Sequence, residues 1–458
     1  MLKVTNPFNN ETLAELPVHT EQQVQAAIGA AVGVRSALAR MPAYERAAVL
    51  SRTAALIGDS ADDLTRLIAR ESGKPIRYAR AEVLRATETF AFAADEARRL
   101  HGETIPMDAA RGGVGRIGYY VREPIGLVAA ITPFNFPLNL VAHKVAPAIA
   151  AGCPILLKPS PMTPLTALRL AEIMAEAGLP PHAFQVLIGD ADVGRWLTAD
   201  PRIAMLTFTG SYPVAHRISQ TAGVRRTTFE LGGNAATIVD EGTPISDSLI
   251  NRLLVGCFAY SGQVCISVQR LYVHGSLYGE FTDRFVRSAE RLRLGDPLDE
   301  QTEIGPLIND AAAQRITNWI SEATEGGARV LAGGTGEGRL FRPTVLDHVT
   351  SDMQVMCAEA FGPVVNLLPY TDFEQALDAV NDSEFGLQAG VFTPSLAHAM
   401  QAAQRLQVGG VMINDTPSFR VDHMPYGGNK HSGVGREGPR FAIEEMTTLK
   451  MIVINSQL

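Results

Sequence analysis

The chain has 458 residues, of which 46% are hydrophobic and 19% charged, and its formal net charge is −8. This composition predicts a globular protein of two or three domains and excludes a disordered chain or a fibre. An acidic chain without a dense stripe of lysine and arginine has no general attraction for nucleic acid. The most apolar region, residues 126–157, contains polar residues and prolines, which argues against a membrane span. Because residues 1–13 lack the apolar core of a signal peptide, we expect a cytoplasmic protein.

The cysteines form neither a disulfide framework nor the CxxC spacing of a zinc site. They are Cys153, Cys257, Cys265 and Cys357. We therefore predict free thiols and no metal. A free cysteine is more often a small buried apolar residue than a nucleophile, so only its sequence context identifies a catalytic one.

Roughly the first 100 residues have the apolar spacing of helices. The pattern is clearest over residues 21–41, 43–72 and 81–100. Thr20, followed three positions later by Gln23, fits a capping box at the start of the first helix.

From residue 115 onward, short β-rich segments alternate with helical ones. Segment 115–134 is expected to form strands. Further strands are expected at 153–160, 184–190, 203–211 and 227–233, with helices at 163–179, 191–200 and 211–223. Such alternation implies right-handed crossovers and a parallel sheet covered on both faces.

A second alternating set begins near Ser246 and predicts a second α/β domain. Residues 247–265 form a long helical pattern that runs up to Cys265. Later strands and helices are expected within 270–276, 277–292, 316–334, 374–393 and 396–414. The segment 447–458 is an apolar strand, which needs a sheet to join, and a partner subunit is one option.

Five short segments carry side chains suited to chemistry, although each has a plainer interpretation by itself. Cys265 in SGQVCIS follows a helical stretch and a glycine, and a buried thiol is the plainer interpretation. Glu230 in TTFELGG ends an apolar strand, where α/β sheets present their ligands, but a solvated loop residue is equally common there. Asn135 in ITPFNFP has an amide that can donate to an oxyanion, or it can serve a turn.

The remaining two segments have features of a nucleotide site. Lys158 in ILLKPS leaves a buried strand, and its cation can hold a ribose hydroxyl or a phosphate, or lie at the surface. In LTFTGSYPVA a strand opens through Gly210 and Ser211 into a helix, whose N-terminus can face a pyrophosphate. The GxGxxG signature is absent, so this segment alone is a moderate signal.

The order of these segments resembles that of the aldehyde dehydrogenase superfamily over nearly the whole chain. The resemblance includes PFNFP, LKPS, FTGS, ELGG and GQVC, then EAFGPV at 359–364 and PYGGNKHSGVGREG at 425–438. It implies an α/β fold with a dinucleotide-binding, five-stranded parallel-sheet domain, an α/β catalytic domain and a β-arm for oligomerisation. The implied boundaries are 1–104 with 123–232, then 233–436, and 105–122 with 437–458. A homodimer or homotetramer is implied as well.

The resemblance implies that Cys265 is the nucleophile, which forms a thiohemiacetal with the aldehyde and then a thioester. Asn135 and the backbone N–H of Cys265 are implied as the oxyanion hole. Glu230 is implied as the general base that hydrolyses the thioester. Because acyl-transferring relatives that use coenzyme A typically lack this glutamate, its presence favours hydrolysis to the free acid. A catalytically silent relative would be expected to have lost part of this set.

The implied cofactor is NAD or NADP. Lys158 is implied to contact the adenosine ribose, Gly210 and Ser211 the pyrophosphate, and Glu359 and Phe361 the nicotinamide ribose and ring. The wider cofactor set is Thr132, Pro133, Phe134, Ser160, Pro161, Gly189, Phe208, Thr209, Leu231 and Gly232.

The sequence departs from the family pattern in three places. Pro161 stands where NAD-preferring members often carry a glutamate, so no carboxylate there repels a 2′-phosphate and NADP becomes acceptable. Ala215 replaces the last glycine of the FTGS run. The usual N-terminal strand is expected to be lacking.

The substrate is expected to be a short polar aldehyde. Val264, before the nucleophile, is apolar, whereas relatives that handle phosphorylated or phosphonate aldehydes tend to have arginine there. Arg85, His143 and Arg420 are candidates to meet an anionic or hydroxylated substrate, although each has a plainer interpretation as a surface or helix-pairing residue. The segments SFRVDHMPYGG and GQVCIS look most like lactaldehyde and related hydroxyaldehyde dehydrogenases. Semialdehydes and sulfo- or phospho-aldehydes remain alternatives.

Overall fold

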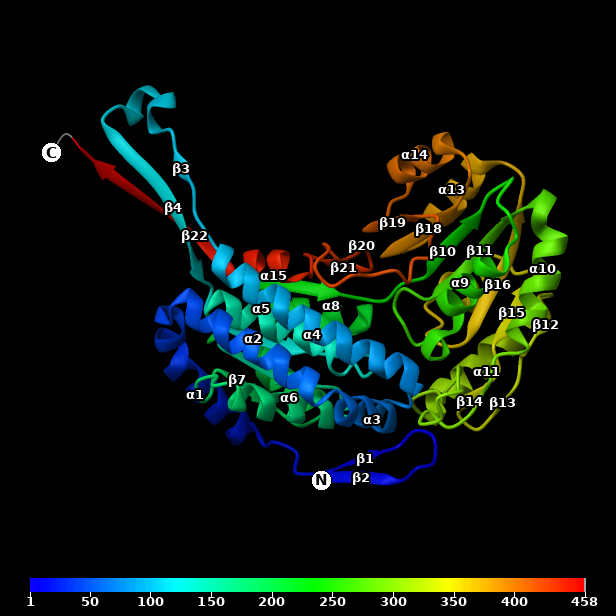
Figure 1. Cartoon of the computed structure of the whole chain (residues 1–458), viewed down its shortest axis with the longest axis horizontal. Helices are drawn as coiled ribbons and strands as arrows, with labels where there is room; N and C mark the ends of the chain where they lie inside the picture. Colours follow the sequence, from blue (N-terminus) through cyan, green and yellow to red (C-terminus); the bar gives the residue numbers. More distant parts are fainter. Residues whose placement is uncertain (457–458) are drawn as a thin grey trace.

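The computed structural model describes residues 1–456 and contains two α/β lobes and a projecting β-arm (Figure 1). The first lobe is built on a six-stranded sheet of order β21-β9-β8-β5-β6-β7. Its five parallel strands are β5 (Leu127–Ile131), β6 (Ile155–Lys158), β7 (Phe184–Val186), β8 (Ile203–Thr209) and β9 (Arg226–Glu230). The sixth strand, β21 (Gly433–Val434), was not expected and pairs antiparallel with β9.

Helices cover both faces of this sheet, as its near-continuous apolar strands require. The apolar side chains on one face pack with α2 (Ala43–Asp59), α3 (Ala61–Ser72), α4 (Ile76–Arg99), α5 (Asn139–Ala151) and α6 (Leu165–Glu176). Those on the other face pack with α1 (Glu21–Arg40), α7 (Ala191–Ala199) and α8 (Tyr212–Ala222). Thr20 and Gln23 form the expected capping box at α1.

The second lobe is built on a seven-stranded sheet of order β12-β15-β16-β11-β10-β18-β19, in which β12 alone is antiparallel to its neighbour. The strands are β10 (Ala235–Val239), β11 (Val268–His274), β12 (Arg329–Ala332), β15 (Thr344–Asp347), β16 (Val364–Tyr370), β18 (Gln388–Phe392) and β19 (Gly410–Ile413). Its helices are α9 (Asp247–Phe258), α10 (Gly275–Ala289), α11 (Asp310–Glu325), α12 (Gln354–Cys357), α13 (Phe373–Asn381) and α14 (Leu396–Arg405). Two small antiparallel sheets complete the lobe, β13 (Gly336–Glu337) with β14 (Leu340–Phe341) and β17 (Phe385–Gly386) with β20 (Asn429–Lys430).

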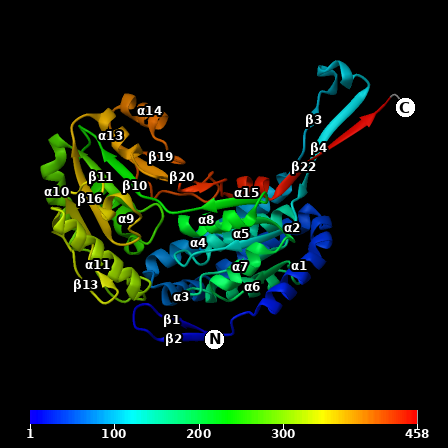
Figure 2. The ribbon, with the colours of Figure 1, turned by 180° about the vertical axis from the view of Figure 1, so that it is seen from behind.

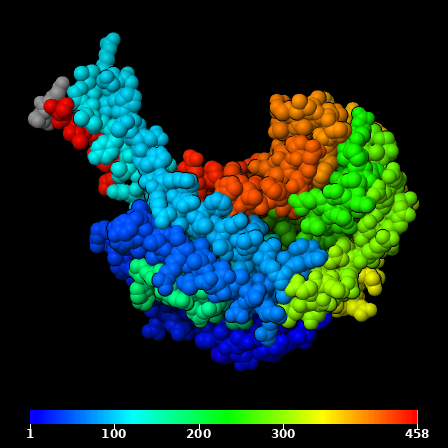
Figure 3. Space-filling view, viewed as in Figure 1, coloured from blue at the N-terminus to red at the C-terminus, as the bar shows by residue number. Residues whose placement is uncertain are grey.

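The arm is a three-stranded sheet of β3 (Thr104–Ile105), β4 (Arg116–Pro124) and β22 (Thr447–Asn455). Helix α15 (Pro439–Glu445) precedes β22 in the chain. It projects away from both lobes, and a broad hollow separates it from the second lobe (Figures 1, 2 and 3). The apolar terminal strand therefore joins β4 of its own chain. Residues 457 and 458 lie outside the described part.

Two expectations for the N-terminal region are wrong. A β-hairpin, β1 (Leu2–Thr5) with β2 (Thr12–Leu16), lies within the region expected to be helical, and it supplies the N-terminal strand expected to be lacking. Its strands are short and half-exposed, so they have no clear period. Within residues 1–456, no helix is long and apolar enough to cross a membrane.

The helix expected to reach Cys265 ends at Phe258. After it, Tyr260, Ser261 and Gly262 have φ angles of 50°, 56° and 68°, which are not helical. Tertiary hydrogen bonds hold this kink, because the Tyr260 hydroxyl donates to the Ser72 carbonyl at 2.7 Å and Ser261 Oγ donates to the Gly305 carbonyl at 2.7 Å. Helical spacing cannot reveal such bonds to distant residues.

Candidate active site

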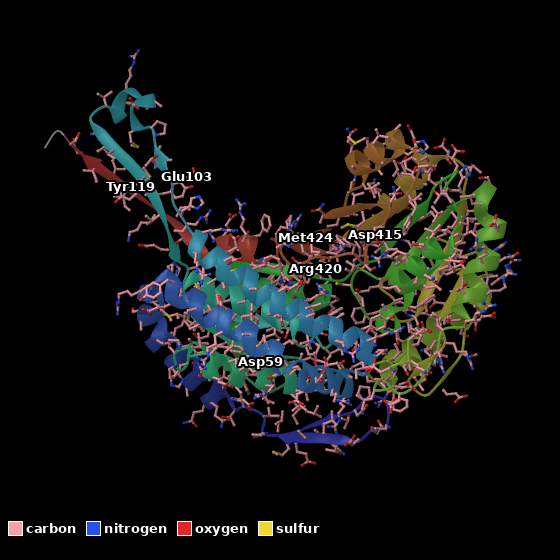
Figure 4. All side chains as sticks on the ribbon, viewed as in Figure 1. Asp59, Glu103, Tyr119, Asp415, Arg420 and Met424 are labelled. Carbon is pink, nitrogen blue, oxygen red and sulfur yellow. The ribbon has the colours of Figure 1, made fainter. Side chains whose placement is uncertain are left out.

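The candidate residues gather where the parallel strands of the first sheet end. Lys158, Thr209 and Glu230 are the last residues of β6, β8 and β9, and Thr132 follows β5. Ligands of open α/β sheets bind at this edge. The loop that carries Arg420 and Met424 lies between the two lobes (Figure 4).

Cys265 lies in the loop after the kink and is half-buried. Its Sγ is 3.1 Å from the hydroxyl oxygen of Tyr426. Burial raises the pKa of the thiol to about 11, although the Tyr426 hydroxyl and the Arg420 charge oppose the rise. The resting nucleophile is therefore a thiol that must lose its proton as it attacks. A side chain at position 233 would place its Cβ 2.3 Å from the Cys265 carbonyl oxygen, which explains Gly233.

Asn135 points its amide at the same loop. The side chain is 2% exposed, and its Nδ2 donates to the carbonyl of Gln263 at 3.0 Å. Gln263 is fixed in turn, because its Oε1 accepts from the backbone N–H of Ile308 at 2.9 Å. One of the two Asn135 N–H groups is thus used to anchor the amide beside the nucleophile loop, and the second is left to donate elsewhere.

Glu230 is buried, and neither of its carboxyl oxygens has a partner among the described residues. Burial and the nearby charge of Glu437 raise its pKa well above the usual value, against the opposing charges of Arg420 and Lys144. A Cβ at Gly427 would lie 2.8 Å from Glu230 Oε1, so the glycine after Tyr426 leaves room for this carboxyl. A carboxyl with such an environment can accept a proton near neutral pH.

The proposed cofactor residues fit a dinucleotide. Thr132 and Thr209 have buried hydroxyls without a partner among the described residues, and both hydroxyls lie at strand ends. Gly210 lies against the Phe208 ring, since a Cβ there would lie 2.4 Å from that ring. Ser211 is the N-cap of α8 but makes no side-chain cap, so the helix N-terminus stays available to an anion.

Lys158 has a buried ammonium group that contacts only carbonyl oxygens. Its Nζ donates to Pro159 at 3.0 Å and to Gly189 at 3.4 Å. Burial lowers the pKa of Lys158 to about 8, and the charge of Asp190 opposes this. Such a group gains from an added acceptor such as a ribose hydroxyl or a phosphate.

Glu359 and Phe361 approach the site from the second lobe. Glu359 Oε1 accepts the Gly233 N–H at 3.0 Å, and burial raises the pKa of this carboxyl to about 7. A Cβ at Gly232 would lie 2.4 Å from Glu359 Oε2. Phe361 has a φ of 45° and meets the Phe134 ring edge to face at 5.7 Å.

The other cofactor candidates are positioned by backbone contacts. Thr132 N–H donates to the Lys158 carbonyl at 3.2 Å, and Leu231 N–H donates to the Ser432 carbonyl at 3.0 Å. Ser160 Oγ accepts the Met162 N–H at 3.2 Å. Pro133 and Pro161 are half-buried.

The substrate candidates Arg85, His143 and Arg420 meet around one carboxylate. Arg85 donates two hydrogen bonds to Asp422, at 2.8 and 3.0 Å. His143 Nε2 lies 2.7 Å from Asp422 Oδ1 and 3.0 Å from Arg420 Nη2. Val264 packs in the small apolar cluster that contains Cys265 and Tyr426.

Arg420 packs on the tyrosine that contacts the candidate nucleophile. Its guanidinium carbon is 3.6 Å from the centre of the Tyr426 ring, and its Nη2 is 3.3 Å from Glu437 Oε2. Its Nε is buried and has no partner among the described residues. An unsatisfied guanidinium N–H beside the thiol is suited to an oxygen of an anionic ligand.

The sequence did not single out Tyr426, Asp422, Glu437 or Lys144. Lys144 Nζ donates to Glu437 Oε1 at 2.9 Å and to Thr207 Oγ1 at 3.0 Å. Lys144, His143 and Arg420 hold the pKa of Glu437 at about 2, although burial opposes this. A lysine within an otherwise apolar helical stretch was the available signal for a buried charge pair.

Comparisons with known proteins find relatives over almost the whole chain. A family model described as the aldehyde dehydrogenase family matches residues 1–452. The chain is 45% identical to a 3-sulfolactaldehyde dehydrogenase of Priestia megaterium, over 99% of this chain and 95% of that protein. Aldehyde dehydrogenase 21 of Physcomitrella patens, solved with the reaction product succinate, has a TM-score of 0.98 at 44% identity and covers 100% of this chain and 95% of its own. Glyceraldehyde-3-phosphate dehydrogenase GapN of Methanocaldococcus jannaschii, solved with NADP, has a TM-score of 0.95 at 37% identity and covers 99% of each chain.

Proposed function

The chain belongs to the aldehyde dehydrogenase family, and we propose that within it the enzyme oxidises a short polar aldehyde, lactaldehyde-like and bearing one anionic group, to its carboxylate. The enzyme is an NAD(P)-dependent oxidoreductase. The observation that carries the choice of substrate is the buried, unpartnered Nε of Arg420 beside the Cys265–Tyr426 pair. The 45% identity to a 3-sulfolactaldehyde dehydrogenase supports the same choice.

In the proposed reaction, Cys265 Sγ attacks the aldehyde carbon and forms a thiohemiacetal. The thiol, whose pKa is raised to about 11, gives up its proton as it attacks, and the Glu230 carboxylate is the proposed acceptor, which passes that proton to solvent before the second half of the reaction. Asn135 Nδ2 and the Cys265 backbone N–H are the proposed donors to the oxyanion, and losing one such donor costs about 2.7–4 kcal/mol in barrier. NAD(P), when bound, supplies the acceptor for the hydride that leaves the aldehyde carbon as the thioester forms.

Glu230 is the proposed base for the second half of the reaction. It takes a proton from water, whose oxygen attacks the thioester carbon, and returns that proton to the sulfur as the C–S bond breaks, so the carboxylic acid and the Cys265 thiol are released. The raised pKa of Glu230 supports this role, since a more basic carboxylate takes a proton from water more readily. The same carboxyl argues against the two alternatives, an enzyme that transfers the acyl group to coenzyme A and a catalytically silent relative.

Two further features are proposed from the resemblance. Pro161 places no carboxylate at the ribose, so NADP is accepted as well as NAD. The arm is proposed to join subunits into a homodimer or homotetramer. Several exposed apolar side chains on its strands support this proposal. They are Ile105, Ile117, Leu449, Met451, Val453 and Ile454.

The test is the initial rate of NADH and NADPH formation across matched aldehydes. The panel is glycolaldehyde and lactaldehyde as neutral substrates, succinate semialdehyde and 3-sulfolactaldehyde as monoanions, and glyceraldehyde 3-phosphate as a dianion. The proposal predicts the highest kcat/KM for a monoanion and no requirement for coenzyme A. Equal kcat/KM for neutral and anionic aldehydes would refute the role of Arg420, and turnover only with coenzyme A would refute that of Glu230.

A further inference from the structure

Asp422 is the carboxylate that Arg85 and His143 contact, and Arg420 contacts His143 in turn. Its side chain is 1% exposed, and it accepts from Arg85 Nε at 3.0 Å and Nη2 at 2.8 Å. Asn139 Nδ2 donates to Asp422 Oδ1 at 3.0 Å, and His143 Nε2 lies 2.7 Å from that oxygen. His143 and Arg85 hold the pKa of Asp422 far below its usual range, although burial opposes this, so the group is a permanent anion.

The pairing with Asp422 commits Arg85. The Nε and Nη2 of Arg85 donate to the two carboxylate oxygens of Asp422 in a bidentate ion pair. Arg85 comes from α4 and keeps about a quarter of its side chain exposed, whereas the Arg420 side chain is 6% exposed. The two arginines therefore differ: the Nε of Arg85 is bound to Asp422, whereas the Nε of Arg420 is buried and has no partner among the described residues.

The charges of the buried cluster sum to a single excess cation. Arg85, Lys144 and Arg420 are positive, whereas Asp422 and Glu437 are negative. Burial and the Arg420 charge lower the pKa of His143, and burial raises the pKa of Glu230, so in both groups the surroundings oppose the charged form. One excess positive charge in a site of low dielectric complements one negative charge on a ligand.

We propose that Asp422 is a specificity-determining residue: by holding Arg85 it leaves Arg420 as the cation for the substrate and limits the preferred aldehyde to a single negative charge. This inference rests on the proposed function, because it concerns the charge of the substrate in the same site. Asp422 acts through the arginines and is a positioning residue that does not itself touch the aldehyde.

The inference predicts opposite effects for the two partners. Asp422→Asn keeps the shape and hydrogen-bonding capacity of the side chain but removes the charge, which frees Arg85 and adds a net cation. The ratio of kcat/KM for glyceraldehyde 3-phosphate to that for glycolaldehyde should rise about tenfold, mainly through KM. Arg85→Gln leaves Asp422 under-compensated beside Arg420, so the ratio for succinate semialdehyde to glycolaldehyde should fall about tenfold.

Two further variants complete the design. The double variant Asp422→Asn with Arg85→Gln removes both charges and should return both ratios to within about threefold of the original enzyme. Arg80→Gln is the matched control, because Arg80 is on the same helix and pairs with the exposed Glu300 at 2.6 Å, far from the cluster. It should change neither ratio.

Thermal unfolding of each variant separates misfolding from specificity. If Asp422→Asn does not fold, the Arg85→Gln variant, at a position about a quarter exposed, still tests the charge argument on its own. Unchanged ratios in folded Asp422→Asn and Arg85→Gln, or changes of the same sign in both, overturn the inference while oxidation of glycolaldehyde leaves the proposed function intact. Failure of the original enzyme to oxidise any of the aldehydes overturns the proposed function itself, and the inference with it.

Discussion

Replacing Tyr426 by phenylalanine tests how the protein controls the reactivity of Cys265. The ring and its contact with Arg420 remain, but the hydroxyl 3.1 Å from Sγ is lost. With a thiol pKa of about 11, roughly one molecule in a thousand carries the thiolate at pH 8, against about a quarter for an ordinary cysteine. A hydrogen bond to a charged group contributes about 1.5–3 kcal/mol, so Tyr426→Phe should reduce the thiolate about 10- to 100-fold further.

Alkylation by iodoacetamide measures this directly. Mass spectrometry of the peptides that contain Cys265 and Cys357 gives the rate at the candidate nucleophile and, from the exposed Cys357, an internal reference on the same molecule. In the unmodified enzyme, alkylation of Cys265 should rise about tenfold per pH unit between pH 7 and 10, because the raised pKa keeps the reactive form scarce. If Tyr426→Phe alkylates Cys265 as fast as the original enzyme, the hydroxyl does not stabilise the thiolate and the reasoning fails.

Three other predictions follow from the site, the core and the arm. Glu230→Gln should release about one reduced cofactor per subunit in a burst and then stall at the thioester, and in the original enzyme deacylation should slow as the pH falls through the raised pKa of Glu230; steady turnover without a burst would contradict this. Lys74→Met removes the partner of buried Glu82 and should lower the free energy of unfolding in denaturant by about 3–5 kcal/mol, while Arg77→Met at an exposed ion pair should change it by about 1 kcal/mol or less; equal effects would refute the contrast. Leu449→Asp on the exposed strand β22 should shift sedimentation toward the monomer, and an unchanged distribution would exclude the arm from the subunit contact.

Local patterns were enough to predict the alternation of strands and helices in both lobes. Apolar runs such as residues 155–158 and 203–209 were bounded by glycine and proline, and they lie in the sheet as expected. Because parallel strands share one carboxyl edge, the positions of Lys158, Thr209 and Glu230 along the chain already implied that they would lie together. The capping box at Thr20 is similarly local, as it spans one helical turn.

Features that depend on distant contacts could not be predicted. The kink at Tyr260 is held by Ser72, and the extra strand β21 comes from a segment two hundred residues beyond the strand it joins. The N-terminal hairpin is a third case: of its eight paired residues, Val4 is the one buried at 1% exposure, so it had little apolar signal. For this reason the predictions of helix in the N-terminal region and of a lacking N-terminal strand were wrong.

The candidate site divides in the same way. The residue types and motifs of Cys265, Asn135 and Glu230 were enough to propose their chemical roles. The structure adds the contacts of Cys265 with Tyr426 and of Asn135 with Gln263. Which arginine is free was not readable from the sequence, since Arg85 and Arg420 differ only in the carboxylates that they meet. Asp422 lies in the segment SFRVDHMPYGG, whose sequence indicated only a family resemblance, because a single aspartate in a loop gives no sign of a buried ion pair.

The pairing of β21 with β9 has a consequence for biosynthesis. Glu230 and Cys265 emerge from the ribosome well before Arg420, Tyr426 and Glu437, and Gly433 pairs opposite Glu230 only after nearly the whole chain has been translated. Until then, the nascent polypeptide holds the Cys265 thiol without the tyrosine that contacts it, and Glu230 without the nearby charge of Arg420. Assembly of the reactive centre is therefore a late event in synthesis, and a truncated translation product that retained both lobes' main strands would still lack a competent catalyst.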